Sequence, residues 1–491
     1  MADAKSDASA DEQERRRRSL KPLRRLAPYL ARYKAKVAGA LFFLVLAAAT
    51  TLSLPLAVRR MIDRGFTHSD STFIADYFAA LIGIAAVLAL ASAGRYYFVI
   101  TLGERVVADL RRDVFTHVTR LSASFFDRAQ SGEIVSRLTA DTTQIKSAVG
   151  PTASVALRNI ILSVGALIMM LYTSPKLSGL VIVAIPVIVV PLIAFGRSVR
   201  RKSRQAQDTL AEATAFASEQ IGAMRTLQAF TNEAMANGRF GKAVEAAFRA
   251  AQSSILARAF LTFLAIFMIF SSVVAVLWFG SADVLSGRMT PGTLSQFLIY
   301  SVLAATALGS LSEVWGDLSI AAGAAERLSE ILAEVPAIAA PAQPVRMPAG
   351  PAGMVRFEDV SFAYPTRTSQ AAVSELSLTA QPGETVAIVG PSGAGKSTVF
   401  SLILRFYDPD RGTVRIDGVD LREADPHEAR ARVAIVPQDV TIFAATVREN
   451  IGFGRPGASD AEIAQAAKDA LADEFIRGME KGYDTMSASG A

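Results

Sequence analysis

Gly390-Pro391-Ser392-Gly393-Ala394-Gly395-Lys396-Ser397-Thr398 is the stretch that decides how the C-terminal part of this chain folds. It fits the pattern G-x4-G-K-[ST] of a phosphate-binding loop, or P-loop. The apolar, β-branched residues 385–389 before it predict a strand, and residues 398–406 after it predict a helix. In such a loop the glycines leave backbone N–H groups free to surround phosphates, and the helix dipole adds attraction. The sequence therefore predicts a site for ATP or GTP.

Two side chains of the loop carry the remaining chemistry. As in P-loop NTPases generally, Lys396 is expected to reach the β and γ phosphates and Ser397 to ligate Mg²⁺. The alternative, a glycine-rich turn with no ligand, does not account for the complete motif between a strand and a helix. We therefore expect ATP and Mg²⁺ as the cofactors.

Long apolar runs dominate the chain before residue 331. Crossing a hydrocarbon core of about 30 Å takes roughly 20 helical residues, and suitable runs lie at 37–58, 73–100, 152–172, 177–195, 260–279 and 293–311. The net charge is +6, and Lys and Arg gather before the first run and after the second and fourth. This bias indicates membrane orientation rather than nucleic-acid binding, with the N-terminus, the long loops and the C-terminal half in the cytoplasm.

The spacing of prolines predicts long helical extensions below the membrane. No proline lies between Pro55 and Pro151, or between Pro191 and Pro291. A helix over 75–122 would be roughly 70 Å long, more than twice the membrane core, and residues 197–249 also have helical composition. Two cytoplasmic hairpins are expected. The short loop 174–176 predicts that the third and fourth spans are antiparallel neighbours.

Composition divides the chain into four parts. We expect a disordered cytoplasmic tail at 1–20, a six-helix transmembrane domain at 21–333, a Pro-, Ala- and Gly-rich linker at 334–353, and a nucleotide-binding domain at 354–491 that begins with β-type alternation. The basic stretch 21–36 is either an amphipathic surface helix interrupted at Pro28 or a solvated linker. The absence of cysteine excludes disulfides, thiolate metal sites and a cysteine nucleophile.

Residues 355–485 resemble the ATP-binding cassettes of the ABC transporter superfamily, exporter type. Tyr364 stands where these cassettes place an aromatic that stacks on adenine, although a strand-end tyrosine packed in the core is the alternative. Gln438 matches the glutamine that touches Mg²⁺ and senses the transmembrane helices. Residues 412–418 look like the strand and turn after the P-loop helix, and 442–451 also match. The resemblance implies an α/β P-loop NTPase cassette.

The membrane half is similar to the same family. Phe125-Phe126-Asp127, the motifs at 131–138 and Asp141 look like the first intracellular loop, residues 216–223 look like the second, and 325–327 look like the end of the sixth helix. In the family these loops carry short coupling helices that dock on the cassettes, one of them on the partner subunit's. The alternative is a set of solvated charged loops. The fold class implied is a multi-domain membrane protein, with a six-helix transmembrane domain and an incomplete cassette.

Several family motifs are absent from these residues. After Thr485 the family continues into a Leu-Ser-Gly-Gly-Gln signature, a catalytic glutamate and a switch histidine, whereas no histidine follows His427 here and the chain runs to Ala491. Asp473 and Glu474 are interpreted as a solvated helix face, so no catalytic residue is assigned. We expect a C-terminally truncated cassette with little or no coupled hydrolysis. Its P-loop strand would lack parallel neighbours and expose an apolar edge.

The leading function is an exporter half-subunit that moves an amphipathic or lipid-like substrate out of a bacterium across its cytoplasmic membrane. Its partners would be membrane lipid and a second half-transporter subunit, in a homodimer or heterodimer, and not nucleic acid. The alternatives are a nucleotide-binding regulator and a fragment without hydrolysis or transport. Arg158, in the third span, is the substrate candidate, since a charge in lipid is costly. Snorkelling of Arg158 to the interface is equally compatible with its position.

Overall fold

The computed structural model describes residues 20–487 except for 66–70, 351, 368 and 439. The expected disordered tail at 1–20 lies outside these residues, apart from Leu20. The chain divides into two compact units. The helical unit comprises Met1–Arg120 and Gln130–Glu334, and the P-loop unit comprises Leu121–Ala129 and Val335–Ala491.

Among the described residues, six helices of the helical unit are long and apolar enough to cross a membrane, as predicted. The elements of this unit are η1 (Lys21–Leu26), α2 (Ala27–Ala31), α3 (Lys34–Arg60), η2 (Met61–Gly65), α4 (Ser71–Val118), α6 (Ser131–Ser136), η3 (Arg137–Asp141), α7 (Thr142–Ser147), η4 (Ala148–Thr152), α8 (Ala153–Thr173), α9 (Pro175–Gly222), α10 (Met224–Ala229), α11 (Glu233–Leu285) and α12 (Pro291–Ala333). The basic stretch at its start is a broken helix rather than a continuous one.

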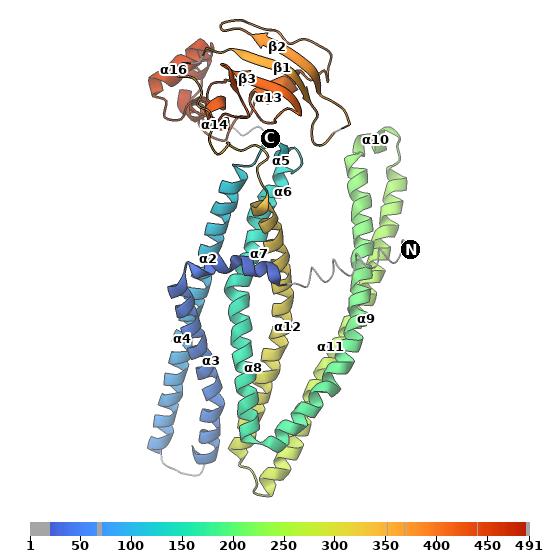
Figure 1. The fold of residues 1–491 in the computed structure, drawn as a ribbon. Helices are drawn as coiled ribbons and strands as arrows, with labels where there is room; N and C mark the ends of the chain where they lie inside the picture. Colours follow the sequence, from blue (N-terminus) through green and yellow to red (C-terminus); the bar gives the residue numbers. More distant parts are fainter. Residues whose placement is uncertain (1–19, 66–70, 351, 368, 439, 488–491) are drawn as a thin grey trace. The chain divides into compact units, whose positions relative to one another are not determined.

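The long helices extend well beyond a membrane core. Helices α4 and α9 have 48 residues each and α11 has 53. At 1.5 Å per residue each is about 70 Å long or more, so the predicted extensions are confirmed. The second hairpin, expected over 197–249, turns through the short helix α10 between α9 and α11 (Figure 1).

The prediction that the third and fourth spans are neighbours is correct only at their ends. A single residue, Ser174, separates α8 from α9, and its hydroxyl caps α9 by accepting the Leu177 N–H at 3.3 Å. Beyond this turn α8 packs mainly on α12, and α9 packs mainly on α11 (Figure 1). The turn fixes only the helix ends, while side-chain packing along the whole length decides the partner. The three main helix pairs are therefore α3 with α4, α8 with α12, and α9 with α11.

One ion pair lies within the α8–α12 pair, between α12 and the segment that leads into α8. Arg327 of α12 donates to both carboxylate oxygens of Asp141, from Nε at 2.9 Å and from Nη2 at 2.5 Å. Asp141 is buried and belongs to η3, in the segment that leads into α8. Both residues were singled out in the sequence only by resemblance, and the structure shows that they bind each other.

Replacing Arg327 by Ala is expected to lower the free energy of unfolding of the helical unit by about 2 kcal/mol, because a buried carboxylate loses a bidentate partner. Unfolding of this unit can be followed selectively, since both tryptophans, Trp278 and Trp315, lie in α11 and α12. The neighbouring Glu326→Ala is the control, because Glu326 is exposed. Equal effects of the two variants would contradict a stabilising role for the ion pair of Arg327 with Asp141.

The P-loop unit contains, among the described residues, a four-stranded antiparallel sheet in the order β2-β1-β3-β4. Its elements are α5 (Ala123–Phe126), β1 (Val355–Phe362), β2 (Val373–Ala380), α13 (Lys396–Ile403), β3 (Arg411–Ile416), β4 (Val419–Asp420), α14 (Pro426–Arg430), α15 (Val447–Gly452), α16 (Asp460–Asp469), α17 (Asp473–Arg477) and η5 (Gly482–Asp484). Phe357, Val360 and Phe362 of β1 are buried in the core. The strand expected from the alternation of apolar residues is present as β1.

The strand predicted at 385–389 is wrong: the segment is irregular and belongs to no sheet of the described residues. A strand needs backbone partners on a neighbouring strand, and none of the described residues supplies them here. Val389 is 86% exposed, whereas Ile388 still packs on the core. The apolar exposure expected for this segment is therefore present. The later apolar segment 433–437 is likewise unpaired, with Val436 93% exposed.

Candidate nucleotide-binding site

The P-loop connects the irregular segment 385–389 to helix α13. Gly395 has φ of +85° and stands at the N-cap of α13. A Cβ atom there would collide with the carbonyl oxygen of Ala372, just before β2. Glycine is thus required both by the left-handed backbone and by the close approach of the loop to the sheet. The local fold holds the start of α13 in a fixed place beside β2.

The start of α13 is suited to an anion. Among the described residues no side-chain hydrogen bond caps its first turn, so the N–H groups there can bind an external acceptor, and the helix dipole favours negative charge. Ser392, Gly393 and Ala394 line the exposed part of the loop. These features fit the phosphates of a nucleotide.

Lys396 already lies over the loop. Its ammonium donates to the carbonyl oxygens of Gly390 at 2.8 Å and Pro391 at 2.7 Å. These are neutral acceptors, and a phosphate oxygen would form a stronger, charge-assisted bond with the same ammonium. Ser397 is exposed on the first turn of α13, where its hydroxyl is free to ligate Mg²⁺ beside a bound phosphate.

Tyr364 and Thr398 connect the end of β1 to α13. The Tyr364 hydroxyl lies 3.1 Å from Thr398 Oγ1, and Thr398 is buried. The Tyr364 ring is half-buried and packs edge-on against Phe362 and Tyr407, with centroids 5.1 and 5.2 Å apart. This is the core packing weighed as the alternative for Tyr364. Stacking on adenine stays a prediction.

Gln438 is not brought together with Ser397 by any contact among the described residues. It follows the unpaired segment 433–437, and its side chain is exposed. A shared Mg²⁺ between Gln438 and Ser397 therefore stays a prediction. Glu474 is exposed at the start of α17, whereas Asp473 there accepts from Arg477 and Tyr483 at 2.9 and 2.6 Å. Asp473 and Glu474 lie on a helix rather than after a buried strand.

A contact that the sequence does not predict joins the loop around α5 to this site. The Tyr407 hydroxyl donates to the carboxylate of Asp127, just after α5. Ala123 of α5 packs on the core of the P-loop unit, and Ser122 Oγ accepts the N–H of Ile338 at 2.8 Å. Burial and the hydrogen bond to Asp127 raise the pKa of Tyr407, so its phenol remains a donor at neutral pH. The first loop therefore docks on the chain's own P-loop unit.

Arg158 lies on α8 with its side chain exposed. Arg95 of α4 is the more buried of the two arginines: it donates to Ser154 Oγ at 2.9 Å, one turn before Arg158. Arg95 therefore connects α4 to α8. The role of Arg158 in binding a substrate stays a prediction.

Six membrane-crossing helices and a P-loop domain on one chain define a class of nucleotide-binding membrane proteins. The chain belongs to the ABC transporter family. Residues 37–308 match the family model of the ABC transporter transmembrane region, and residues 373–489 match the ABC transporter model. The recognition made from the sequence motifs is confirmed.

Relatives come from both eukaryotes and bacteria. ATP-binding cassette sub-family B member 10, mitochondrial, of Mus musculus is 34% identical over 92% of this chain and 64% of its own length. ABC multidrug transporter mdr2 of Aspergillus fumigatus is 33% identical over 92% of this chain and 57% of its own length. A Rickettsia typhi protein whose name describes an export ATP-binding/permease protein is 28% identical over 95% of this chain and 81% of its own length. The chain spans 49% to 64% of the length of three eukaryotic relatives.

Proposed function

We propose that this chain is the ATP-binding subunit of an exporter, in which Mg·ATP at the P-loop drives movement of the membrane helices. The observation that carries the proposal is the docking of the first loop. Helix α5 lies between α4 and α6 in the chain, yet it belongs to the P-loop unit, where Asp127 binds Tyr407. Tyr407 in turn packs on Tyr364, which contacts Thr398 of α13. A change at the phosphates thus has a continuous path of contacts to α5, which the chain connects to α4.

The site would hold ATP and Mg²⁺ mainly through residues of the P-loop. The loop from Gly390 to Gly395 would surround the phosphates, Lys396 would bind the β and γ phosphates, and Ser397 would ligate the metal. Tyr364 and Gln438 are proposed for adenine and for Mg²⁺. The bound metal would neutralise charge on the phosphates.

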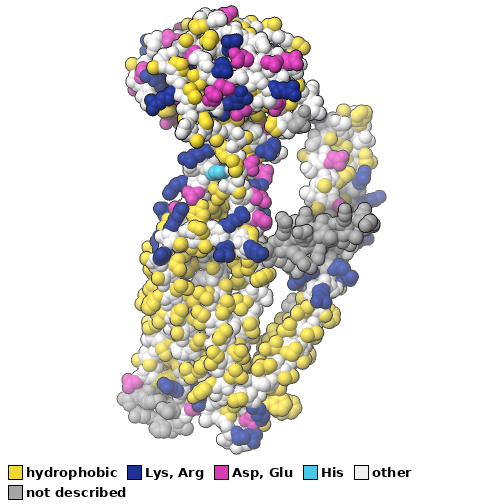
Figure 2. All heavy atoms as spheres, viewed as in Figure 1, with side chains coloured by type: hydrophobic (Ala, Val, Ile, Leu, Met, Phe, Trp, Pro, Cys, Tyr) yellow, Lys and Arg dark blue, Asp and Glu magenta, His cyan; other side chains and the backbone are white. Residues whose placement is uncertain are grey.

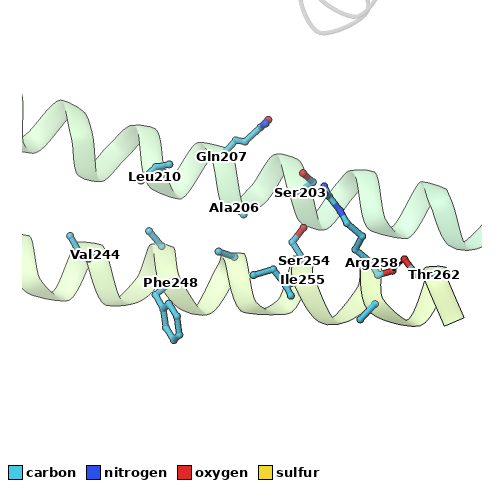
Figure 3. Close-up of a pocket in the computed structure, with 13 residues that line it drawn as sticks. Ser203, Ala206, Gln207, Leu210, Val244, Phe248, Ser254, Ile255, Arg258 and Thr262 are labelled. Carbon is cyan, nitrogen blue, oxygen red and sulfur yellow. Dashed lines mark hydrogen bonds between the residues drawn. The ribbon is translucent and has the colours of Figure 1, made fainter. Parts of the chain in front are cut away.

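A second half-transporter subunit is proposed because the α9–α11 pair exposes an apolar groove that lies mostly beyond the apolar runs 177–195 and 260–279. The groove measures about 700 Å³ and lies between the two helices (Figure 3). Leu210, Phe248 and Ile255 in it are 58%, 59% and 66% exposed. The other groove of the same pair is polar, lined by residues such as Gln205, Thr209 and Glu245. Apolar side chains beyond the hydrocarbon need a protein partner, whereas the polar face suits water.

Replacing Phe248 by Glu is expected to weaken the dimer about tenfold or more, because a charge would enter an apolar interface. The ratio of dimer to monomer can be measured by mass photometry of the chain in lipid nanodiscs. Thr209→Glu, on the polar face of the same helix pair, is the matched control. Equal loss of dimer in both variants would contradict an interface at the apolar groove.

The substrate and the membrane remain proposals. An amphipathic or lipid-like substrate is proposed from the apolar character of the six spans, with Arg158 as the residue that would contact its acidic group. The cytoplasmic membrane of a bacterium is proposed, with the N-terminus and the P-loop on the cytoplasmic side. Figure 2 shows Lys and Arg side chains along the helical unit where its apolar surface ends, and exposed Arg24, Arg25 and Arg32 lie just before α3, as a positive-inside orientation requires.

The test of transport is ATP-dependent uptake into inside-out vesicles that contain the chain, screened with fluorescent lipids and amphiphiles. Uptake that needs Mg·ATP and Lys396 would support the exporter. Uptake that is the same in Lys396→Ala would contradict it.

A second candidate is a nucleotide-binding membrane protein without hydrolysis. The unpaired segments 385–389 and 433–437 favour it. They lead into the P-loop and into Gln438, and neither belongs to a sheet of the described residues. This candidate predicts that the 491-residue chain binds Mg·ATP but releases no phosphate. Phosphate release that depends on Lys396 would exclude it.

A further inference from the structure

Polar contacts join the end of α3 to the start of α12. The Asp63 carboxylate, just after α3, accepts from the Gly292 N–H and from Thr290 Oγ1, both at 2.9 Å. Arg59 Nε lies 3.5 Å from Asp63 Oδ2, and Arg59 Nη1 donates to Gln296 Oε1 at 3.2 Å. Gln296 is fully buried in α12. Residues far apart in the sequence are thus connected in one small cluster.

The start of α12 is shaped for this carboxylate. Thr290 caps the helix by accepting the Thr293 N–H at 3.1 Å, while its hydroxyl donates to Asp63. A negative charge at a helix N-terminus is also favoured by the helix dipole. A Cβ atom at Gly292 would collide with Asp63 and would lie 2.6 Å from the Arg59 carbonyl oxygen. Only glycine allows α3 and α12 to approach this closely.

The Asp63 cluster lies at one end of the boundary between the α3–α4 and α8–α12 pairs. The α3–α4 pair is also bound to the segment leading into α8, by Lys146 to Glu104 at 2.8 Å and by Arg111 to Thr142 at 2.9 Å. Those two bonds lie on the cytoplasmic extension of α4. The Asp63 cluster therefore holds the opposite, outer end of the boundary between α3–α4 and α8–α12.

We propose that Asp63 is a latch that keeps the outer ends of α3 and α12 together and must release them when the helical unit opens outward. The inference rests on the proposed function, because an exporter has to open a path on its outer side. Asp63 is suited to reversible release: its side chain is 19% exposed, so water can replace its partners as the ends separate. Asp63 acts as a positioning residue and need not touch the substrate.

A second carboxylate near the outer ends of the helices, that of Asp283, serves as the comparison for Asp63. Asp283 of α11 is buried and accepts from Lys176 of α9 and from Arg288, at 2.9 and 2.7 Å. It joins α9 to its own packing partner α11, within one helix pair. Loss of Asp283 should leave the boundary between α3 and α12 closed.

The experiment measures access to that boundary from outside. The chain has no cysteine, so the thiol introduced by Leu52→Cys is the only one that a maleimide can label. Leu52 of α3 packs half-buried against residues of α8 and α12, and its carbonyl accepts from Tyr300 at 2.7 Å. Sealed right-side-out vesicles are treated with a membrane-impermeant maleimide, without nucleotide, in the Leu52→Cys background. The variants compared are Asp63→Ala, Gly292→Ala and the control Asp283→Asn.

We expect Asp63→Ala and Gly292→Ala each to raise the labelling rate roughly tenfold or more, the shift that loss of hydrogen bonds to a charged group produces in a two-state equilibrium. Gly292→Ala displaces the carboxylate without removing its charge, so it tests the same contact independently if one variant fails to fold. Asp283→Asn should label at the parent rate. Parent-rate labelling in both latch variants, or equal acceleration by Asp283→Asn, would overturn the proposal. Failure of ATP binding or transport alone would instead count against the proposed function, because this labelling needs no nucleotide.

Discussion

Replacing Lys396 by Ala is expected to weaken binding of ATP at least about 100-fold, because the variant loses charge-assisted bonds to the β and γ phosphates. The ammonium now rests on two neutral carbonyl oxygens, so its removal should cost the loop little stability. AMP lacks the phosphates that Lys396 would bind, and its affinity should change little. Displacement of a fluorescent ATP analogue from the chain in lipid nanodiscs measures both affinities.

Lys468→Ala is the matched control for Lys396→Ala. Lys468 is an exposed lysine on α16 of the same unit, and its loss removes the same charge without touching the P-loop. A similar loss of ATP affinity in both variants would indicate a general effect of charge and would contradict the role given to Lys396.

Replacing Tyr407 by Ala is expected to destabilise the P-loop unit by about 3–5 kcal/mol, the usual cost of truncating a large buried aromatic side chain. Tyr407 is 8% exposed, and its ring packs against Phe362 and Tyr364 with both centroids 5.2 Å away. The free energy of unfolding of a whole domain is only about 5–15 kcal/mol, so much of the stability of this unit would be lost. Hydrogen exchange of β1 and β3 amides reports on this unit alone.

Tyr407→Phe separates packing from the contact to Asp127. It keeps the ring and removes the hydroxyl, so we expect a loss of about 1–2 kcal/mol together with faster exchange in α5. The raised pKa of Tyr407 sets the pH dependence. Its contribution is complete below the unfolded pKa of about 10 and is lost as pH rises through the higher folded pKa. The phenylalanine variant should lack this alkaline loss, and equal alkaline loss in both proteins would contradict the contact.

The membrane half could be predicted well because its signals are local. Uninterrupted apolar runs and missing prolines are enough to predict α4, α11 and the extension of α9 beyond Pro191. Which helices pair could not be predicted, since this depends on contacts along whole helices. The turn at Ser174 suggested that α8 lies along α9, but each of them packs mainly with another helix.

The P-loop unit shows a second limit of structure prediction from the sequence. In β1 the apolar positions Phe357 and Val360 are three apart, which breaks strict alternation. The structure accommodates them with register shifts and with Asp359 at φ of +49°, a feature that pairing with both neighbouring strands imposes. Residues 385–389 have strand composition, yet composition cannot supply a neighbouring strand. The P-loop itself was predictable because its chemistry lies within one short segment.

Tyr407 and Asp127 were missed as a pair because they are distant in the sequence. In the sequence Asp127 stands out only through the family resemblance, and Tyr407 belongs to no motif. The signal available was a tyrosine soon after the predicted P-loop helix, which is common in any core. Folding brings the two together, and only the structure shows that they connect the first loop to the nucleotide site.

The described P-loop is expected to bind Mg·ATP on a chain that spans the membrane. Equilibrium binding of Mg·ATP to the purified 491-residue chain in lipid tests this most directly. We predict saturable binding that weakens when Mg²⁺ is chelated and is lost in Lys396→Ala. Absence of binding, or binding that Lys396→Ala leaves unchanged, would contradict the account.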